Sequence, residues 1–317
     1  MEIKVIILNA RSKAFAAVNI EMLNAYFEIG RKIVEEEQKG KSRAGYGGKV
    51  IDLLSSELKI EFGSGFDGSN LRRMRRFYLA YKIWETLSPK LTWSHYCELI
   101  KISNRLERNF YEKECIQERW GVRDLRRQIE SGLFYRLPAG KKEGGFLQLA
   151  SEGHKLLKPE DIVKDPYVFE FLKLPEPYSE KELEERIIKN LQMFLLELGK
   201  GFSFVARQFR MNIGKKQFYA DLVFYNKELR CYVLIDLKIS KISHSDVGQM
   251  NLYLNYFKSK VNSLGDNEPI GIILSRDKDN IEIKYALGGI SSQIFTSKYM
   301  LSLPSAEDLK RAVESSC

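Results

Sequence analysis

Residues 217–238 read QFYADLVFYNKELRCYVLIDLK and decide the fold of the second half of the chain. The two apolar runs are rich in β-branched and aromatic residues, and the polar link NKEL between them suits a tight hairpin. The stretch therefore predicts two antiparallel strands. Asp221 lies inside the first run, and Asp236 and Lys238 close the second. Because side chains alternate between the two faces of a strand, Asp236 and Lys238 share one face.

The register of this hairpin decides whether the two aspartates meet. If Tyr225 pairs with Arg230, Asp221 lies opposite Leu234, and Asp236 becomes its diagonal neighbour on the same face. Diagonal partners stand roughly 7–8 Å apart at the backbone, within reach of one bridging cation. A slip of one residue would put the two carboxylates on opposite faces of the sheet.

Two buried carboxylates are costly unless a cation compensates them. Hard oxygen ligands, in a chain with only three histidines, favour Mg²⁺ or Mn²⁺ over zinc. Such a metal can polarise a phosphodiester and generate hydroxide from bound water. Lys238 would then hold or activate the attacking water, or neutralise the phosphate. In the alternative interpretation, Asp221 and Asp236 are solvated strand ends that bind no metal.

The flanking sequence predicts a mixed α/β domain. An amphipathic helix comes first and ends at Gly199, and strand-like runs follow it. After the hairpin come another helix and a continuous apolar run that is typical of a buried parallel strand. The predicted order is αβββαβ with one further strand: helix 180–198, strands 202–209, 217–226 and 230–239, helix 246–258, and strands 269–275 and 281–287.

Other polar groups are expected near the same place. Glu184 lies on the inward stripe of the 180–198 helix and could supply a third metal-facing oxygen, with Glu180 one turn earlier as the alternate. The other interpretation is an acid that the helix dipole favours near the helix start. Four more residues could touch a backbone phosphate, or serve packing and surface roles instead: Arg207, Gln208, Gln249 and Tyr253.

The first half of the chain is predicted to be a basic, all-α unit. Residues 1–160 hold 29 Lys and Arg against 21 Asp and Glu, and so carry +8 of the formal net charge of +9. Many short helices on a basic unit are typical of helix-turn-helix and winged-helix DNA binders. One helix, capped by Ser69, carries a cluster that could meet phosphates and base edges in a major groove, unless it is a solvated face: Arg72, Arg73, Arg75 and Arg76.

The predicted organisation is a helical nucleic-acid-binding domain at 1–140, a linker at 141–178 and a catalytic domain at 179–317. No apolar run approaches the roughly 18–20 residues of a membrane span, and we recognise no signal peptide. The four cysteines form no CxxC pair, which fits a reducing cytoplasm. The sequence leaves open whether the chain forms a homo-oligomer.

The longest motifs carry a resemblance to a known family. The string FLLELGKGFSFVARQFRMNIGKKQFYADLVFYNKELRCYVLIDLK, followed by DVGQMNLYL and PIGIILS, resembles the bacterial YhcG nucleases of the PD-(D/E)XK, or restriction-endonuclease-like, superfamily. The N-terminal strings AAVNIEMLNAYFEIGRKI, GFDGSNLRRMRRFY and WGVRDLRRQI are similar to the helical N-terminal domain of that family. The resemblance extends over nearly the whole chain.

The resemblance implies roles for individual residues. Asp221, Asp236 and Lys238 would be the nuclease triad, Glu184 the helix acid and Gln249 the residue on the following helix. This chain has Asp-Leu-Lys where family members usually have Glu-Leu-Lys, and the superfamily motif permits either acid.

Two hypotheses of different classes follow. The first is a metal-dependent DNA endonuclease whose helical domain grips nucleic acid while the C-terminal sheet cuts it, in restriction, defence or DNA processing. The second is a catalytically silent nucleic-acid-binding subunit of a restriction or defence complex. RNA is a further possible substrate. A plasmid, branched-DNA and RNA cleavage assay with and without Mg²⁺ or Mn²⁺ separates them.

Overall fold

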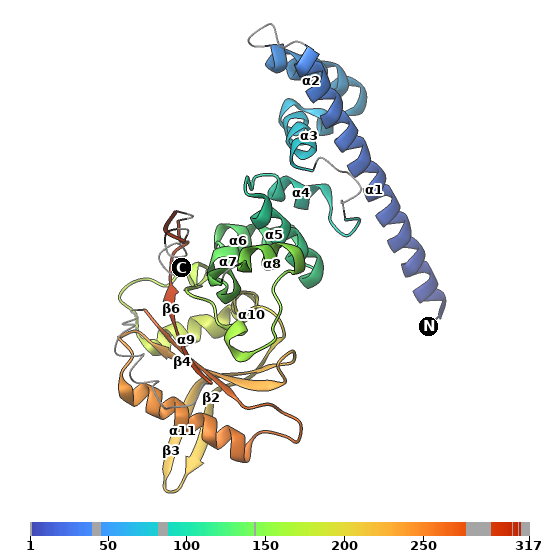
Figure 1. The fold of residues 1–317 in the computed structure, drawn as a ribbon. Coiled ribbons are helices and arrows are strands. Elements are labelled where there is room, and N and C mark those ends of the chain that lie inside the picture. Colours follow the sequence, from blue (N-terminus) through green and yellow to red (C-terminus); the bar gives the residue numbers. More distant parts are fainter. Residues whose placement is uncertain are drawn as a thin grey trace. The chain divides into compact units, whose positions relative to one another are not determined.

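The computed structural model describes residues 2–39, 46–81, 88–142, 144–276, 293–305, 307–309 and 311 (Figure 1). The chain divides into two compact units, Met1–Arg126 and Arg127–Cys317. None of the helices in the described ranges has both the length and the apolar character of a membrane span.

The first unit is helical, as predicted. Its described residues contain no strand and therefore no β-wing of the kind that a winged-helix domain carries. The helices of this unit, the last of which crosses into the second unit, are α1 (Glu2–Lys39), α2 (Tyr46–Phe62), α3 (Gly68–Ala80), α4 (Trp93–Leu99), α5 (Arg105–Glu118) and α6 (Val122–Glu130).

Helix α3 begins earlier than predicted. Its N-cap is Asp67 and not Ser69, because the Asp67 side chain accepts a hydrogen bond from the Asn70 amide at 2.7 Å. The cap sets the phase of the helix, so Met74 and the apolar residues one turn on either side of it are buried. Gly30 of α1 permits a close approach there, since a Cβ at that position would lie 2.2 Å from the Met74 carbonyl oxygen.

The second unit is built on one mixed sheet with helices on both faces (Figure 1). The strand order is β1-β6-β5-β4-β3-β2, in which β2, β3 and β4 are antiparallel neighbours and β4, β5, β6 and β1 are parallel. The elements are α7 (Leu133–Arg136), α8 (Gly145–Glu152), β1 (Tyr167–Val168), α9 (Glu180–Lys189), α10 (Leu191–Leu198), β2 (Phe202–Ile213), β3 (Lys216–Asn226), β4 (Cys231–Lys238), α11 (His244–Lys260), β5 (Ile270–Ser275) and β6 (Ile294–Met300).

The predicted αβββαβ order is present with three differences. The helix expected over 180–198 breaks at Asn190 into α9 and α10. Strands β1 and β6 complete the sheet and were not predicted. The strand predicted over 281–287 lies outside the described residues. Strand β5 is parallel to β4 and buried along its whole length, which confirms the prediction from its apolar run.

The hairpin between β3 and β4 has a different register from the predicted one. In place of the pair Tyr225–Arg230, the structure pairs Tyr225 with Tyr232 and Asn226 with Cys231, a shift of two residues. The Asn226 side chain accounts for this, because its Oδ1 accepts hydrogen bonds from two backbone amides of the loop at 3.1 and 3.0 Å. A shift of two residues preserves the face on which every side chain lies.

Two apolar cores enclose the sheet. Helices α9 and α10 pack on the face that carries Phe224 and Leu237, and α11 packs on the face that carries Val223 and Leu234 (Figure 1). By strand alternation, Asp236 shares the α11 face with Leu234. The polar residues of the predicted site therefore interrupt the α11 face at its edge.

Much of the segment predicted as a linker is folded into the second unit. The division between the units falls after Arg126, and Phe169 and Leu172 are buried in the core beneath α9 and α10. Tyr167 pairs with Tyr299 of β6 in the sheet. Proline and charged residues suggested an exposed connection here, but the apolar side chains between them are part of the core.

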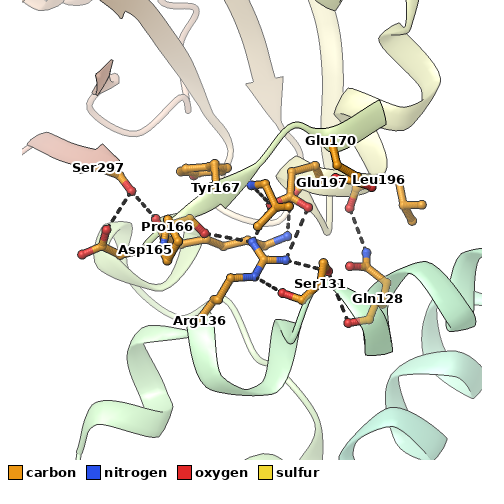
Figure 2. Close-up of polar contacts among 12 residues, drawn as sticks. Gln128, Ser131, Arg136, Asp165, Pro166, Tyr167, Glu170, Leu196, Glu197 and Ser297 are labelled. Atoms are coloured by element: carbon orange, nitrogen blue, oxygen red, sulfur yellow. Dashed lines mark hydrogen bonds and ion pairs between the residues drawn. The ribbon is translucent and has the colours of Figure 1, made fainter. Parts of the chain in front are cut away.

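A buried ionic cluster joins this segment to α10 (Figure 2). Both Glu197 and Arg136 are fully buried, and Glu197 accepts hydrogen bonds from Arg136 Nη1 at 2.5 Å and Arg127 Nη1 at 2.9 Å. The Val168 amide donates to the same carboxylate at 3.0 Å. Burial raises the pKa of Glu197, but Arg136, Lys164 and Arg127 outweigh it and lower the pKa to about 2. Glu197 is therefore a charged structural residue and not a candidate acid catalyst.

Candidate active site

Two carboxylates face each other across the central hairpin. Leu222 pairs with Ile235, so the same register places Asp221 directly opposite Asp236. The prediction had made them diagonal neighbours, and the two-residue shift brings them closer. Both lie on the α11 face of the sheet, so the two carboxyl groups project from it as direct cross-strand neighbours.

Burial and mutual repulsion set the charge state of this pair. Burial, followed by the charge of Asp236, raises the pKa of Asp221 to about 6. Burial also raises the pKa of Asp236, and Lys238 opposes that rise. The two neighbouring carboxyl groups therefore resist ionisation together, and a bound cation would stabilise their ionised forms.

Backbone and side-chain donors hold Asp221 in position. The Leu237 amide donates to its Oδ2 at 2.9 Å, and Gln208 Nε2 donates to its Oδ1 at 3.1 Å. These two bonds come from the neighbouring strands on either side of β3. They fix the carboxylate plane and leave the oxygen lone pairs that face away from the donors for another ligand.

Lys238 supplies the positive charge of the site. Its Nζ lies 3.1 Å from Asp236 Oδ2 and 3.7 Å from Asp246 Oδ1. Burial lowers the pKa of Lys238, but Asp236, Glu180 and Asp246 outweigh it and raise the pKa above its ordinary value. The lysine therefore carries its proton in this arrangement and acts as a cation and hydrogen-bond donor.

Glu184 approaches the site through Gln208. The carboxylate is 4% exposed and accepts short hydrogen bonds from Gln208 Nε2 and Arg207 Nε. Gln208 has a left-handed backbone with φ of 48°, and β2 keeps one register with β3 on either side of it, so Gln208 lies opposite Asp221 and its side chain contacts both Asp221 and Glu184. The sequence predicted Glu184 as a third metal-facing oxygen, and in the structure it orients the residue that orients Asp221.

Arg207 and Gln208 both donate hydrogen bonds to Glu184. Their predicted contacts with a backbone phosphate remain predictions. Tyr253 does not have the predicted contact with a backbone phosphate. It is 1% exposed, and its hydroxyl donates to the Tyr219 carbonyl at 3.0 Å, so it belongs to the core beneath α11 and not to a nucleic-acid surface. Gln249 is half-buried and donates to the Tyr253 hydroxyl. It lies one turn away on α11, beside the site.

Two acidic neighbours of the site have clear structural roles. Asp246 caps the start of α11, where its Oδ2 accepts from the Ser243 amide at 2.7 Å, and its other oxygen faces Lys238. Glu180 accepts from the Ile239 amide at 3.2 Å. The sequence suggested Glu180 only as an alternate to Glu184 and gave Asp246 no role at the site. The position of Asp246 in the first turn of the helix that follows Asp-Leu-Lys could have indicated its place beside Lys238.

The arginine cluster of α3 is divided by its contacts. Arg75 Nε lies 2.7 Å from Glu37, and Arg72 lies 3.4 Å from Asp52. Arg72, Arg73 and Arg76 are exposed, whereas Arg75 is half-buried. Within the described residues of the unit, no acidic partner is found for Arg73 or Arg76. The four arginines thus do not form one uniform surface.

The donor set at the hairpin fits a hard divalent cation. Asp221 and Asp236 offer carboxylate oxygens at one place, where burial raises the pKa of both and Lys238 only partly opposes the rise. Among the described residues, their polar partners include Gln208, the Leu237 amide and Lys238 and no histidine or cysteine, which favours Mg²⁺ or Mn²⁺ over a softer metal. In the described parts of the chain, no three acidic, histidine or cysteine side chains cluster as a ready-made metal site. The third metal-facing oxygen expected from Glu184 stays a prediction.

Paired carboxylates and a lysine on adjacent strands of an αβββαβ sheet define a PD-(D/E)XK nuclease domain of the restriction-endonuclease-like fold. The profile described as the YhcG PDDEXK nuclease domain matches residues 160–314, and that of the DUF1016 N-terminal domain matches residues 2–136. The chain is 38% identical to "Putative nuclease YhcG" of Escherichia coli (strain K12), over 95% of this chain and 89% of that protein. The chain belongs to the YhcG family.

Two solved structures are also similar over part of the chain. The crystal structure of a repair endonuclease from Pyrococcus abyssi matches 41% of this chain and 50% of its own, with 19% identity and a TM-score of 0.28. EndoMS in its apo form matches 41% of this chain and 49% of its own, with 20% identity and a TM-score of 0.26. Similarity at this level bears on neither activity nor substrate.

Proposed function

We propose that this protein is a metal-dependent DNA endonuclease that acts in the cytoplasm in restriction, defence or DNA processing. One observation carries the proposal. Asp221 and Asp236 face each other on the neighbouring interior strands β3 and β4, and Lys238 Nζ lies 3.1 Å from Asp236. A structural role alone would favour replacing such a costly arrangement with apolar side chains.

Asp221 and Asp236 would hold the cation, Mg²⁺ or Mn²⁺. When bound, such an ion polarises a phosphodiester and lowers the pKa of a coordinated water. Gln208 and the Leu237 amide keep Asp221 in a fixed orientation, so the site does not need to reorganise when the cation arrives. Glu184 supports this indirectly by holding Gln208.

Lys238 would neutralise the charge that develops on the phosphate. Its raised pKa makes a protonated amine the resting form, so a role as hydrogen-bond donor to a phosphate oxygen or to the attacking water fits better than a role as general base. The exposed arginines of α3, Arg72, Arg73 and Arg76, would supply sequence-independent contacts to the nucleic-acid backbone.

The test is a cleavage assay with purified full-length protein on plasmid, branched DNA and RNA, with EDTA, Mg²⁺ or Mn²⁺. We expect cleavage of DNA only when the metal is present. Asp236→Asn should abolish it, because it removes a charged ligand at nearly constant volume. Asp236→Glu is the matched control, since it retains the carboxylate and should retain measurable activity.

The result also separates the alternative. A silent nucleic-acid-binding subunit would bind DNA in wild type and in both variants and cut in none. Cleavage of RNA alone would overturn the assignment of DNA as the substrate. Cleavage that is undiminished in Asp236→Asn would place the active site elsewhere.

A further inference from the structure

A cavity of 430 Å³ lies at the carboxyl end of the parallel strands, where β4 and β5 finish. It combines an aromatic ring, an apolar side chain and an ion pair at the surface. The residues that line it are Glu176, Pro177, Tyr178, Ile239 and Arg276.

This cavity adjoins the candidate active site. Lys238 pairs with Ser275 in the sheet, so the next residues along each strand, Ile239 and Arg276, leave the sheet side by side. By alternation they lie on the α9 face, whereas Lys238 lies on the α11 face. The end of β4 thus separates the cavity from the catalytic side chains by one residue. A nucleic-acid strand whose scissile phosphate is held beside Lys238 would have to pass around the end of β4 for a neighbouring nucleotide to enter this cavity.

A second cavity extends the first along the same edge of the sheet. It measures 540 Å³ and shares Glu176 and Arg276 with the first cavity. It continues to β6, where Lys298 and Tyr299 line it. The two cavities together form a groove, floored by the ends of three parallel strands, with Arg276 at its centre and a second cation along it.

The side chains offer the two contacts that a nucleotide needs. The Arg276 guanidinium lies over the Tyr178 ring, 6.0 Å from its centroid, and the Tyr178 hydroxyl is 3.0 Å from that of Tyr299, which anchors the ring. An anchored aromatic ring can stack with any base once the guanidinium moves off its face, and a guanidinium binds phosphate with two parallel hydrogen bonds. Ile239, 38% exposed, adds apolar surface beside the ring.

Glu176 occupies the place that a phosphate would take. Its carboxylate lies 2.8 Å from Arg276 Nη2, and the two side chains are 55% and 47% exposed. An ion pair this exposed contributes little to stability, so a phosphate can replace the carboxylate at low cost. Glu176 thereby keeps Arg276 oriented in the groove when no nucleic acid is bound.

We propose that this groove binds an unpaired strand of the nucleic acid next to the scissile phosphate, with a base stacked on Tyr178 and the adjoining phosphate on Arg276 in place of Glu176. The assignment rests on the proposed nuclease function, because it takes the adjoining strand from that site. With such a groove, the protein prefers nucleic acid that is single-stranded or frayed next to the scissile phosphate.

The test measures binding separately from cleavage. Fluorescence anisotropy of the full-length protein, in EDTA to prevent cleavage, would use labelled single-stranded, blunt duplex and overhang DNA of equal length. Tyr178→Ala and Arg276→Ala should each weaken binding of the single strand and the overhang by about tenfold. Their affinity for the blunt duplex should change by less than about threefold, because α3 would carry those contacts.

Glu176→Gln gives the sharper result. It frees Arg276 from its carboxylate, so binding of the single strand should tighten by about threefold. Lys258→Ala is the matched control, since Lys258 pairs with Glu268 in an equally exposed ion pair far along α11, and it should leave the strand preference unchanged. Tyr178→Phe keeps the ring and loses only its hydroxyl contact with Tyr299, so it should lose less single-strand binding than Tyr178→Ala. Arg276→Ala keeps the test valid if Tyr178→Ala fails to fold, as judged by circular dichroism.

Three outcomes overturn the inference. One is unchanged single-strand binding in Arg276→Ala and Tyr178→Ala, and another is weaker binding in Glu176→Gln. The third is full competition by a free mononucleotide at the concentration that the strand requires, which would mean a nucleotide site and not a strand path. If wild type cleaves DNA but the variants show none of the expected binding changes, the nuclease function stands and only the proposed role of the groove is overturned. If wild type does not cleave and the binding changes are also absent, the proposed nuclease function is overturned as well.

Discussion

The ammonium group of Lys238 lies 3.1 Å from a carboxylate oxygen of Asp236, two residues earlier on the same strand. Alternation along β4 puts the two side chains on one face, so this contact follows from the Asp-Leu-Lys spacing itself. The other neighbour of Asp236 is Asp221 on the adjacent strand, and one lysine therefore balances only part of the negative charge. The consequences can be tested one residue at a time.

Lys238→Ala should lower metal-dependent DNA cleavage by about 10²- to 10³-fold, because it removes a positioned donor at the developing charge. Binding of Mn²⁺, measured by isothermal titration calorimetry, should be kept or strengthened, since Asp236 loses its competing cation. Lys227→Ala, in the hairpin loop and paired only loosely with Glu228 at 3.8 Å, is the control and should cleave normally. Normal cleavage by Lys238→Ala would exclude the lysine from the reaction.

Metal affinity should depend on pH through Asp221. Burial and Asp236 raise the pKa of Asp221 to about 6, and only the ionised carboxylate binds a cation. The affinity for Mn²⁺ should therefore be nearly constant above pH 7 and fall by about tenfold for each pH unit below 6. Calorimetric titrations from pH 5 to 8 measure this directly. An affinity that is equal at pH 5 and pH 7 would mean that Asp221 is not a ligand.

Glu197→Gln should destabilise the second unit by about 3 kcal/mol, because it leaves the buried Arg136 without its anion, while Arg127 keeps its ion pair with Glu170. Thermal unfolding at pH 7 measures the loss. Glu160→Gln is the matched control, since Glu160 forms a surface pair with Lys158 at 3.6 Å and should change stability by less than about 0.5 kcal/mol.

The cost of Glu197→Gln should itself depend on pH. Arg136, Lys164 and Arg127 lower the pKa of Glu197 to about 2 in the folded protein, from its ordinary value of 4.5. An acid with a depressed pKa contributes its stability above the unfolded pKa and loses it as the pH falls through the folded pKa. The difference in unfolding free energy between wild type and Glu197→Gln should thus shrink between about pH 4.5 and pH 2. A constant difference over that range would contradict the ionic origin of the effect.

Replacing Arg72, Arg73 and Arg76 together with alanine should weaken duplex DNA binding and lower the slope of log affinity against log salt by up to about 3. Arg75→Ala is the control on the same helix. Its side chain is engaged with Glu37, so it should leave the salt slope unchanged. If the triple variant binds like wild type, these arginines are a solvated face and the binding surface lies elsewhere.

Local sequence determined several features of this protein. The β-branched and aromatic runs predicted β2 to β5, and strand alternation put Asp236 and Lys238 on one face. Asp221 lies on the same face even though the predicted register was wrong by two residues. Side chains alternate between the faces with a period of two, so a shift of two residues leaves each side chain on its original face. The charge of the first half and the short helices also predicted a basic, all-α unit, and its described residues are helical.

Only the tertiary structure decided the rest, because the deciding contacts join residues that no local pattern connects. The hairpin register is a local exception, because Asn226 set it by accepting hydrogen bonds from amides two and three residues further along its own loop. Glu184 met Gln208 across 24 residues of chain and so orients the residue that orients Asp221, while its predicted role as a metal ligand stays a prediction. Tyr167 joined the sheet by parallel pairing with Tyr299, and the segment around it became core in place of a linker. Periodicity reports the face on which a side chain lies, whereas its partner depends on the packing of the whole unit.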